Sequence, residues 1–84
     1  MRMPTTVEQF EKLRQGFEDW CEARSGTVFD PAGEYEVFRC KFPKEHGGAT
    51  TLLIHRNAKG RLTYTAASLD LLATYVKEQK NASA

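Results

Sequence analysis

The spacing of apolar residues changes twice along the chain, and this change constrains the fold more than any other feature of the sequence. Near the N-terminus apolar side chains recur every three or four positions, as on one face of a helix. This first stripe consists of Phe10, Leu13, Phe17, Trp20 and Cys21. In the middle of the chain the spacing becomes two, which is typical of half-buried strands. The helical spacing returns in a second stripe, at Leu69, Leu72, Tyr75 and Val76.

The middle of the chain contains three segments with strand character, at residues 34–42, 50–56 and 61–65, and residues 27–29 could add a short fourth strand. The side chains expected to face the helices are Phe38, Cys40, Phe42, Leu52, Ile54, Leu62 and Tyr64. On residues 34–42 the side chains expected on the opposite face are Tyr35, Val37, Arg39 and Lys41. We predict an α+β fold of α-β-β-β-α order: an antiparallel sheet of three to four strands with the N- and C-terminal helices packed on one face.

Local signals predict where the helices begin and end. Thr5 and Glu8 have the spacing of a capping box for the first helix. Gly26 can adopt the left-handed conformation that closes it. Ser68 is a candidate N-cap for the second helix. Residues 81–84 are expected to form a disordered tail.

The length of 84 residues predicts one α+β domain over residues 1–84. A chain this short has little room for a pocket of about 300 Å³ or more, so we expect no small-molecule substrate and no cofactor. No apolar run approaches the roughly 18 residues of a membrane span, and the N-terminus lacks the apolar stretch of a secretory signal. We therefore expect a soluble, cytoplasmic protein that does not contact a membrane.

The residues that most often carry catalysis or bind metal form no recognisable motif. Cys21 and Cys40 are separated by 18 residues, and His46 and His55 follow without the short spacings of a zinc site. Both cysteines fall on predicted apolar faces and are expected to be free thiols in the core. A disulfide would require those two faces to meet, and the inferred reducing compartment argues against it. We expect no metal site and no enzymatic activity.

The net charge of +1 hides an asymmetry between the two halves of the chain. Residues 1–37 contain four basic and eight acidic side chains, whereas residues 38–84 contain eight basic and three acidic ones. We expect Arg39, Lys41 and Arg61 to lie together on the uncovered face of the sheet, close to Tyr35, with Lys59 at a hairpin tip. These five residues are the candidate contacts with an acidic macromolecular partner. The alternative is a solvated sheet face, which is polar whatever the protein does.

Two resemblances bear on function. The order of elements resembles that of the double-stranded-RNA-binding domain, but the family's lysine-rich start of the second helix corresponds here to Ala66-Ala67-Ser68-Leu69-Asp70, which has no lysine. We therefore do not assign the chain to that family. The segments Tyr35-Glu36-Val37-Phe38-Arg39-Cys40-Lys41-Phe42 and Asn57-Ala58-Lys59-Gly60-Arg61-Leu62-Thr63 resemble small accessory proteins of bacteriophages and prophages.

The phage resemblance implies a non-enzymatic module that binds and modulates a host protein in the host cytoplasm. The sequence thus favours protein binding through a basic sheet face. The alternative is direct binding of nucleic acid by the same basic strands. If neither a protein nor a nucleic acid binds the sheet face, the loop at residues 43–49 with His46 is the next candidate contact.

Overall fold

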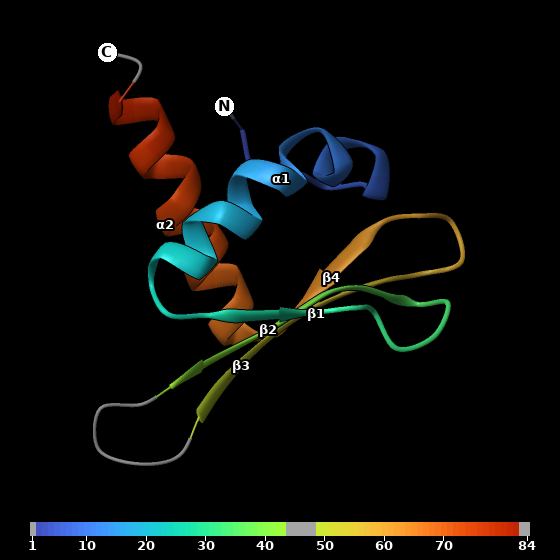
Figure 1. Ribbon diagram of the computed structural model, residues 1–84. Helices are drawn as coiled ribbons and strands as arrows, with labels where there is room; N and C mark the ends of the chain where they lie inside the picture. The colour runs from blue at the N-terminus through green and yellow to red at the C-terminus, as the bar shows by residue number, and fades with distance from the viewer. Residues whose placement is uncertain (1, 44–48, 83–84) are drawn as a thin grey trace.

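The computed structural model describes residues 2–43 and 49–82. The elements are α1 (Val7–Ala23), β1 (Thr27–Phe29), β2 (Glu36–Pro43), β3 (Ala49–Arg56), β4 (Leu62–Tyr64) and α2 (Ala66–Ala82), shown in Figure 1. The strands form an antiparallel sheet in the order β1-β2-β3-β4, so that each strand pairs with its neighbour in the chain. The predicted α+β fold is confirmed, and residues 27–29 do form a fourth strand.

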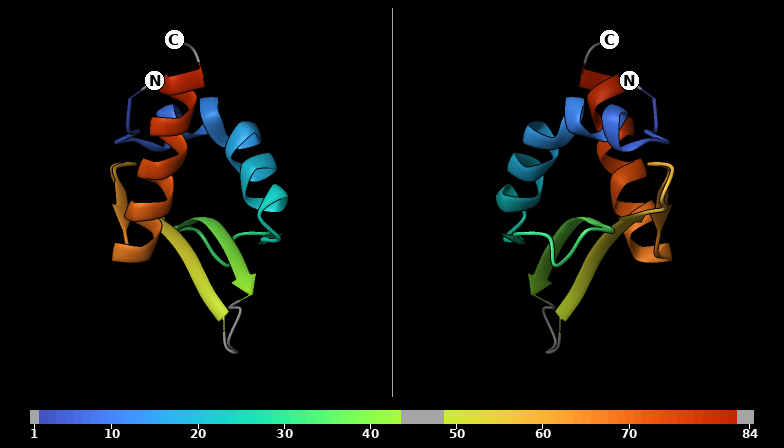
Figure 2. Two further views of the ribbon diagram at one scale, coloured as in Figure 1. Left: turned by 90° about the vertical axis from the view of Figure 1, so that its left-hand side faces the viewer. Right: turned by 90° about the vertical axis from the view of Figure 1, so that its right-hand side faces the viewer.

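Both helices lie on the same side of the sheet, and the β2–β3 hairpin extends beyond them (Figure 2). The five residues of the first apolar stripe are all buried, as predicted. Aromatic rings make up much of the core: the ring centroid of Phe38 lies 5.7 Å from that of Phe10 and 5.1 Å from that of Phe17. The core therefore sits between the sheet and the two helices.

The two helices meet through the second half of α1. The Nε1–H of Trp20 donates to the carboxylate of Glu78 on α2 (2.8 Å), and Arg24 forms an ion pair with the same carboxylate (2.8 Å). A methyl group on Gly16 would overlap the hydroxyl of Tyr75. Gly16 therefore leaves room for the hydroxyl end of the Tyr75 side chain, a packing role that its position off the apolar stripe does not reveal.

The ends of α1 differ from the prediction in detail. The N-cap is Thr6 rather than Thr5, and its side chain accepts from the backbone N–H of Gln9 (3.2 Å). At the C-terminal end Ser25 adopts the left-handed conformation, with φ 65°. The prediction that Gly26 does so is wrong. A side chain would not fit at position 26, because a Cβ there would lie 2.8 Å from the carbonyl oxygen of Cys21.

Helix α2 begins three residues earlier than expected. Thr65 rather than Ser68 precedes its first residue, and its hydroxyl accepts from the backbone N–H of Ser68 (3.3 Å). Ser68 is fully buried in the first turn, whereas Leu69, predicted to be buried, is 46% exposed. The helix continues through residues 81 and 82, so the predicted disorder is wrong for these two residues, and residues 83–84 lie outside the described part of the chain.

Strand β2 is irregular near its start. Glu36 pairs with His55 and Phe38 with Ile54, so β2 has one more residue than β3 between these pairs. The extra residue is Val37, and at such a bulge two successive side chains can point to the same side of the sheet. Both Val37 and Phe38 are buried in the core. The prediction that Val37 lies on the outer face is therefore wrong.

The residues before α1 cover the β4 edge of the sheet. Thr6 forms an antiparallel bridge with Arg61, and the backbone N–H of Leu62 donates to the carbonyl of Thr5 (2.9 Å). The hydroxyl of Tyr64 donates to a carbonyl of the same segment (2.7 Å), and burial raises the pKa of Tyr64 to about 12. The N-terminal segment thus satisfies backbone groups that an open strand edge would leave unpaired.

Candidate interaction surface on the open face of the sheet

The side of the sheet opposite the helices, here called the open face, carries a row of outward-pointing residues. Phe29 of β1 pairs with Arg39 of β2, which in turn pairs with Leu53 of β3. Cross-strand partners point to the same side of a sheet, and Cys40, the next residue along β2, is buried on the helix side. Lys41 follows on the open face. We call Phe29, Arg39, Lys41 and Leu53 the Phe29 patch.

The Phe29 patch combines apolar surface with a cation. Phe29 is 42% exposed, whereas Leu53 is half-buried. The Nζ of Lys41 lies 5.6 Å from the centroid of the Phe29 ring, within the range of a cation–π contact. Lys41 makes no ion pair with any residue that the structure describes. Its charge is therefore available to a partner.

Arg39 is neutralised within the molecule. Because of the bulge, Glu36 lies on the open face with Arg39, and its carboxylate accepts from the Nε–H of Arg39 (2.7 Å) and from the backbone N–H of Ala32. Desolvation raises the pKa of Glu36, but these hydrogen bonds outweigh it and hold the pKa below its usual value. The connection between β1 and β2 thus covers one end of the open face, and Lys41 is the cation of the patch that pairs with no carboxylate among the described residues.

The remaining predicted contact residues lie at the other end of the sheet. The guanidinium of Arg56 lies 5.3 Å from the centroid of the Tyr35 ring, which is exposed. Arg61 accepts, through its carbonyl, a hydrogen bond from the N–H of Asn57, and Lys59 lies in the intervening turn. We call Tyr35, Arg56, Lys59 and Arg61 the hairpin-end cluster.

The strand register separates the hairpin-end cluster from the Phe29 patch. Arg39 is level with Leu53, whereas Arg61 is level with Asn57, which is four residues further along the chain. At roughly 3.3 Å per residue this is about 13 Å along the strand, and Arg61 is also two strands away from Arg39. The prediction that Arg61, Lys59 and Tyr35 lie together with Arg39 and Lys41 is therefore wrong, because the structure keeps the two groups apart.

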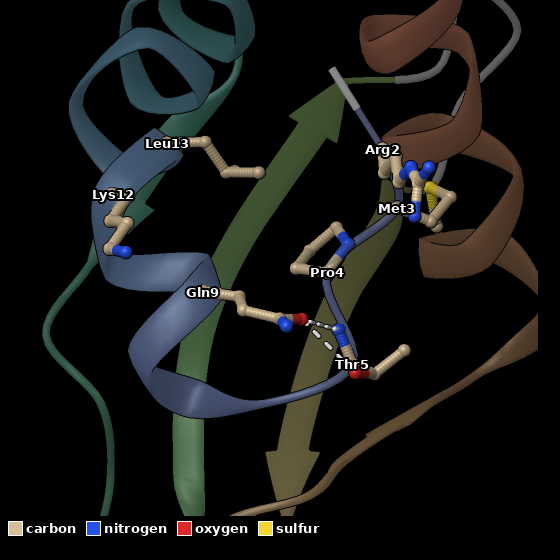
Figure 3. A pocket seen from close by; sticks show the side chains of 7 residues that line it. All are labelled: Arg2, Met3, Pro4, Thr5, Gln9, Lys12 and Leu13. Atoms are coloured by element: carbon tan, nitrogen blue, oxygen red, sulfur yellow. Dashed lines mark hydrogen bonds between the residues drawn. The ribbon is translucent and has the colours of Figure 1, made fainter.

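A hollow of about 420 Å³ lies between the N-terminal segment and the first half of α1 (Figure 3). Met3, Pro4 and Leu13 give it apolar surface, and the cationic side chains of Arg2 and Lys12 are part of its lining. It is larger than the sequence analysis expects for a chain of this length. Its described lining residues include no carboxylate, imidazole or thiol, which are the usual general bases and metal ligands.

Among residues 2–43 and 49–82, no three His, Cys, Asp or Glu side chains lie close enough together to hold a metal ion. Cys21 and Cys40 are free thiols and fully buried, as predicted. In the same part of the chain no helix has the length and apolar character to cross a membrane. Most of the candidate loop at residues 43–49, including His46, lies outside the described residues.

Sequence reasoning missed the apolar half of the Phe29 patch and the role of Glu36. Leu53 could have been found, because strand alternation across the run Leu52-Leu53-Ile54 requires its central residue to point away from the core. Phe29 lies in a strand of three residues, which is too short for a periodicity to show its face. No sequence signal marks the bulge that turns Glu36 toward Arg39.

The comparisons with known proteins add no relative to this description. No protein-family model, no curated protein and no solved structure matches the chain. Any statement about function therefore rests on the surface described above.

Proposed function

We propose that this protein is a non-enzymatic binding module that contacts a protein partner through the Phe29 patch. The observation that carries the proposal is the exposed ring of Phe29 beside the cation of Lys41, which forms no ion pair within residues 2–43 and 49–82, on the sheet face that neither helix covers. Aromatic side chains are enriched at protein interfaces, and a cation beside them can complement an acidic partner surface. An acidic protein surface with an apolar centre would complement this arrangement.

The ion pair between Arg39 and Glu36 favours a protein over a nucleic acid as the partner of this patch. Nucleic-acid binding derives much of its affinity from cations that neutralise phosphates. The patch contains two cations, and the buried carboxylate of Glu36 already pairs with Arg39. The resemblance to phage and prophage accessory proteins points to a bacterial host protein as the partner.

The test is retention of a specific protein from bacterial lysate by the tagged chain. The double variant Phe29→Ala/Lys41→Glu should lose the partner. The matched control Leu69→Ala/Lys77→Glu changes an exposed leucine and an exposed lysine on α2 and should retain it. Raising the salt concentration should slow association of the parent chain, because surface charges are screened. Equal retention by the two double variants would reject the Phe29 patch as the binding site.

The hairpin-end cluster supports a second candidate function, direct binding of nucleic acid. Arg56, which also forms an ion pair with Glu34, lies beside the exposed ring of Tyr35, and Lys59 and Arg61 lie at the same end of the sheet. Stacking on an aromatic side chain combined with phosphate contacts is the usual basis of single-strand binding. Lys59→Glu/Arg61→Glu should then abolish binding of a fluorescent single-stranded oligonucleotide at moderate salt, while Phe29→Ala/Lys41→Glu should leave it unchanged. The absence of oligonucleotide binding by the parent chain would exclude this candidate.

A further inference from the structure

Cys21 and Cys40 come from different elements and meet inside the core. Cys21 lies in the last turn of α1 and Cys40 in the middle of β2, and both side chains have no exposed surface. A Cβ on Gly26 would lie 2.8 Å both from the carbonyl oxygen of Cys21 and from the Sγ of Cys40, so the two cysteines are neighbours in the core, and their thiols interact with each other. The helix face and the strand face that the sequence places separately are therefore brought together by the fold.

The connection between α1 and β1 closes over this thiol pair. The backbone N–H of Gly26 donates to the carbonyl of Cys21 (2.8 Å), and a Cβ on Gly26 would lie only 2.8 Å from the Sγ of Cys40. Burial raises the pKa of both thiols, so the closed state holds little of the reactive thiolate. Because neither thiol has exposed surface, a reagent reaches the sulfur atoms only when the structure around them opens, and the α1–β1 connection at Gly26 is in contact with Cys40.

We propose that Cys21 and Cys40 are a latent internal disulfide, which a low-molecular-weight disulfide such as oxidised glutathione closes when the segment 24–26 opens. The thiolate of one cysteine attacks a sulfur of the small disulfide and releases one small thiolate, leaving a mixed disulfide on the protein. The second cysteine thiolate then attacks the protein-side sulfur and releases the second small thiolate. The protein loses two electrons and two protons, and the small disulfide is reduced to two thiols.

The proximity of the two cysteines determines which product forms. Because the second cysteine is held next to the first, its attack on the mixed disulfide is intramolecular and outpaces a second encounter with the small disulfide. The cross-link joins the end of α1 to β2 and closes a loop of 18 intervening residues that includes β1. A loop of this length restricts the unfolded chain enough to raise the melting temperature by about 10 °C.

The test incubates the reduced protein with oxidised glutathione at urea concentrations below the unfolding transition, followed by alkylation and intact-mass analysis. We expect a species lighter by two hydrogen atoms, a peptide pair linked through Cys21 and Cys40, and a rise of about 10 °C in melting temperature that dithiothreitol reverses. Cys21→Ser and Cys40→Ser should each keep one glutathione and gain no thermal stability.

Three results on the parent chain alone would overturn the proposal, so it stays testable even if a serine variant does not fold. These are accumulation of stable glutathione adducts, formation of disulfide-linked dimers, and failure of the folded protein to form the internal link. An internal link without a rise in melting temperature would also reject it, because the cross-link would then strain the fold rather than fit it.

Discussion

The two faces of the sheet differ in how their side chains are held. On the helix side Phe38 is 1% exposed and packs against rings from two turns of α1. On the open face Arg39, the next residue, is held by one ion pair, and Lys41 by one contact with an aromatic ring. One step along a strand thus separates positions fixed by dense packing from positions held by single polar contacts. Substitutions on the two faces should therefore differ in their cost to stability.

The largest effect is expected on the helix side, at Phe17. Its ring is fully buried and lies 5.1 Å from Phe38 and 5.2 Å from Tyr75, measured between ring centroids. Phe17→Ala should lower the free energy of unfolding by about 3–5 kcal/mol, which is close to the whole stability of a small domain. Far-ultraviolet circular dichroism during urea unfolding measures this loss. A cooperative transition at the parent midpoint would show that the ring is not packed as described.

A smaller effect is expected where α1 leads into the sheet. Gly26→Ala places a methyl group 2.8 Å from a backbone oxygen, the Sγ of Cys40 and the ring of Phe42, so the cost should be about 1–3 kcal/mol. Gly16→Ala is the matched control, because its methyl group meets only the far end of the Tyr75 side chain and improves helix propensity by about 1 kcal/mol. Thermal melts should rank Gly26→Ala below Gly16→Ala. The reverse order would show that the Tyr75 side chain cannot move aside while the neighbours of Gly26 can.

The contacts of Glu36, next to the bulge where the side chains change faces, are tested by the pH dependence of the free energy of unfolding. Its pKa in the folded protein is lower than the usual 4.5, so its contribution to stability is complete above about pH 4.5 and is lost as the pH falls through the folded-state pKa. Glu36→Gln should cost about 1–3 kcal/mol at neutral pH and progressively less in acid. Glu34→Gln is the control, since Glu34 is exposed. A difference between Glu36→Gln and the parent that does not change between pH 7 and pH 3 would contradict this account.

The smallest effect is expected at Lys41 on the open face. Lys41→Glu should change the free energy of unfolding by no more than about 0.5 kcal/mol, because the side chain is exposed and unpaired among the described residues. Arg39→Glu should be more costly, since it places a second carboxylate against the buried Glu36. Urea midpoints of the two variants measure this contrast. A larger loss for Lys41→Glu than for Arg39→Glu would mean that the two cations of the patch have been assigned the wrong roles.

Much of the fold could be predicted because the signals are local. The 3–4 spacing of Phe10, Phe17 and Trp20 identifies the buried side of α1, whichever element later covers it. The alternation of Phe38 and Cys40 likewise identifies the core side of β2. Helix ends were predicted less well, because Thr5 and Thr6 are adjacent and both can cap, and the choice depends on how the preceding segment pairs with the β4 edge.

The candidate surface was predicted only in part, for a different reason. Arg39 and Lys41 follow from strand alternation, but their grouping with Arg61 and Tyr35 requires the pairing register of three strands. Register is a property of two segments at once, and a periodicity of two is the same in every register that keeps the buried face buried. Whether the charge of Arg39 is neutralised within the molecule likewise depends on a contact with Glu36 that only the bulge creates.

The sequence by itself determined the kinds of element, their order and most of the side chains that enter the core, because backbone geometry converts residue spacing directly into faces. Only the tertiary structure decided that Val37 turns inward and Glu36 outward, that Cys21 meets Cys40, and that Phe29 lies beside Lys41. These contacts join residues from different elements, or depend on one extra residue in a paired strand. Their free energy exists only when both partners are in place, so no local pattern in the chain encodes them.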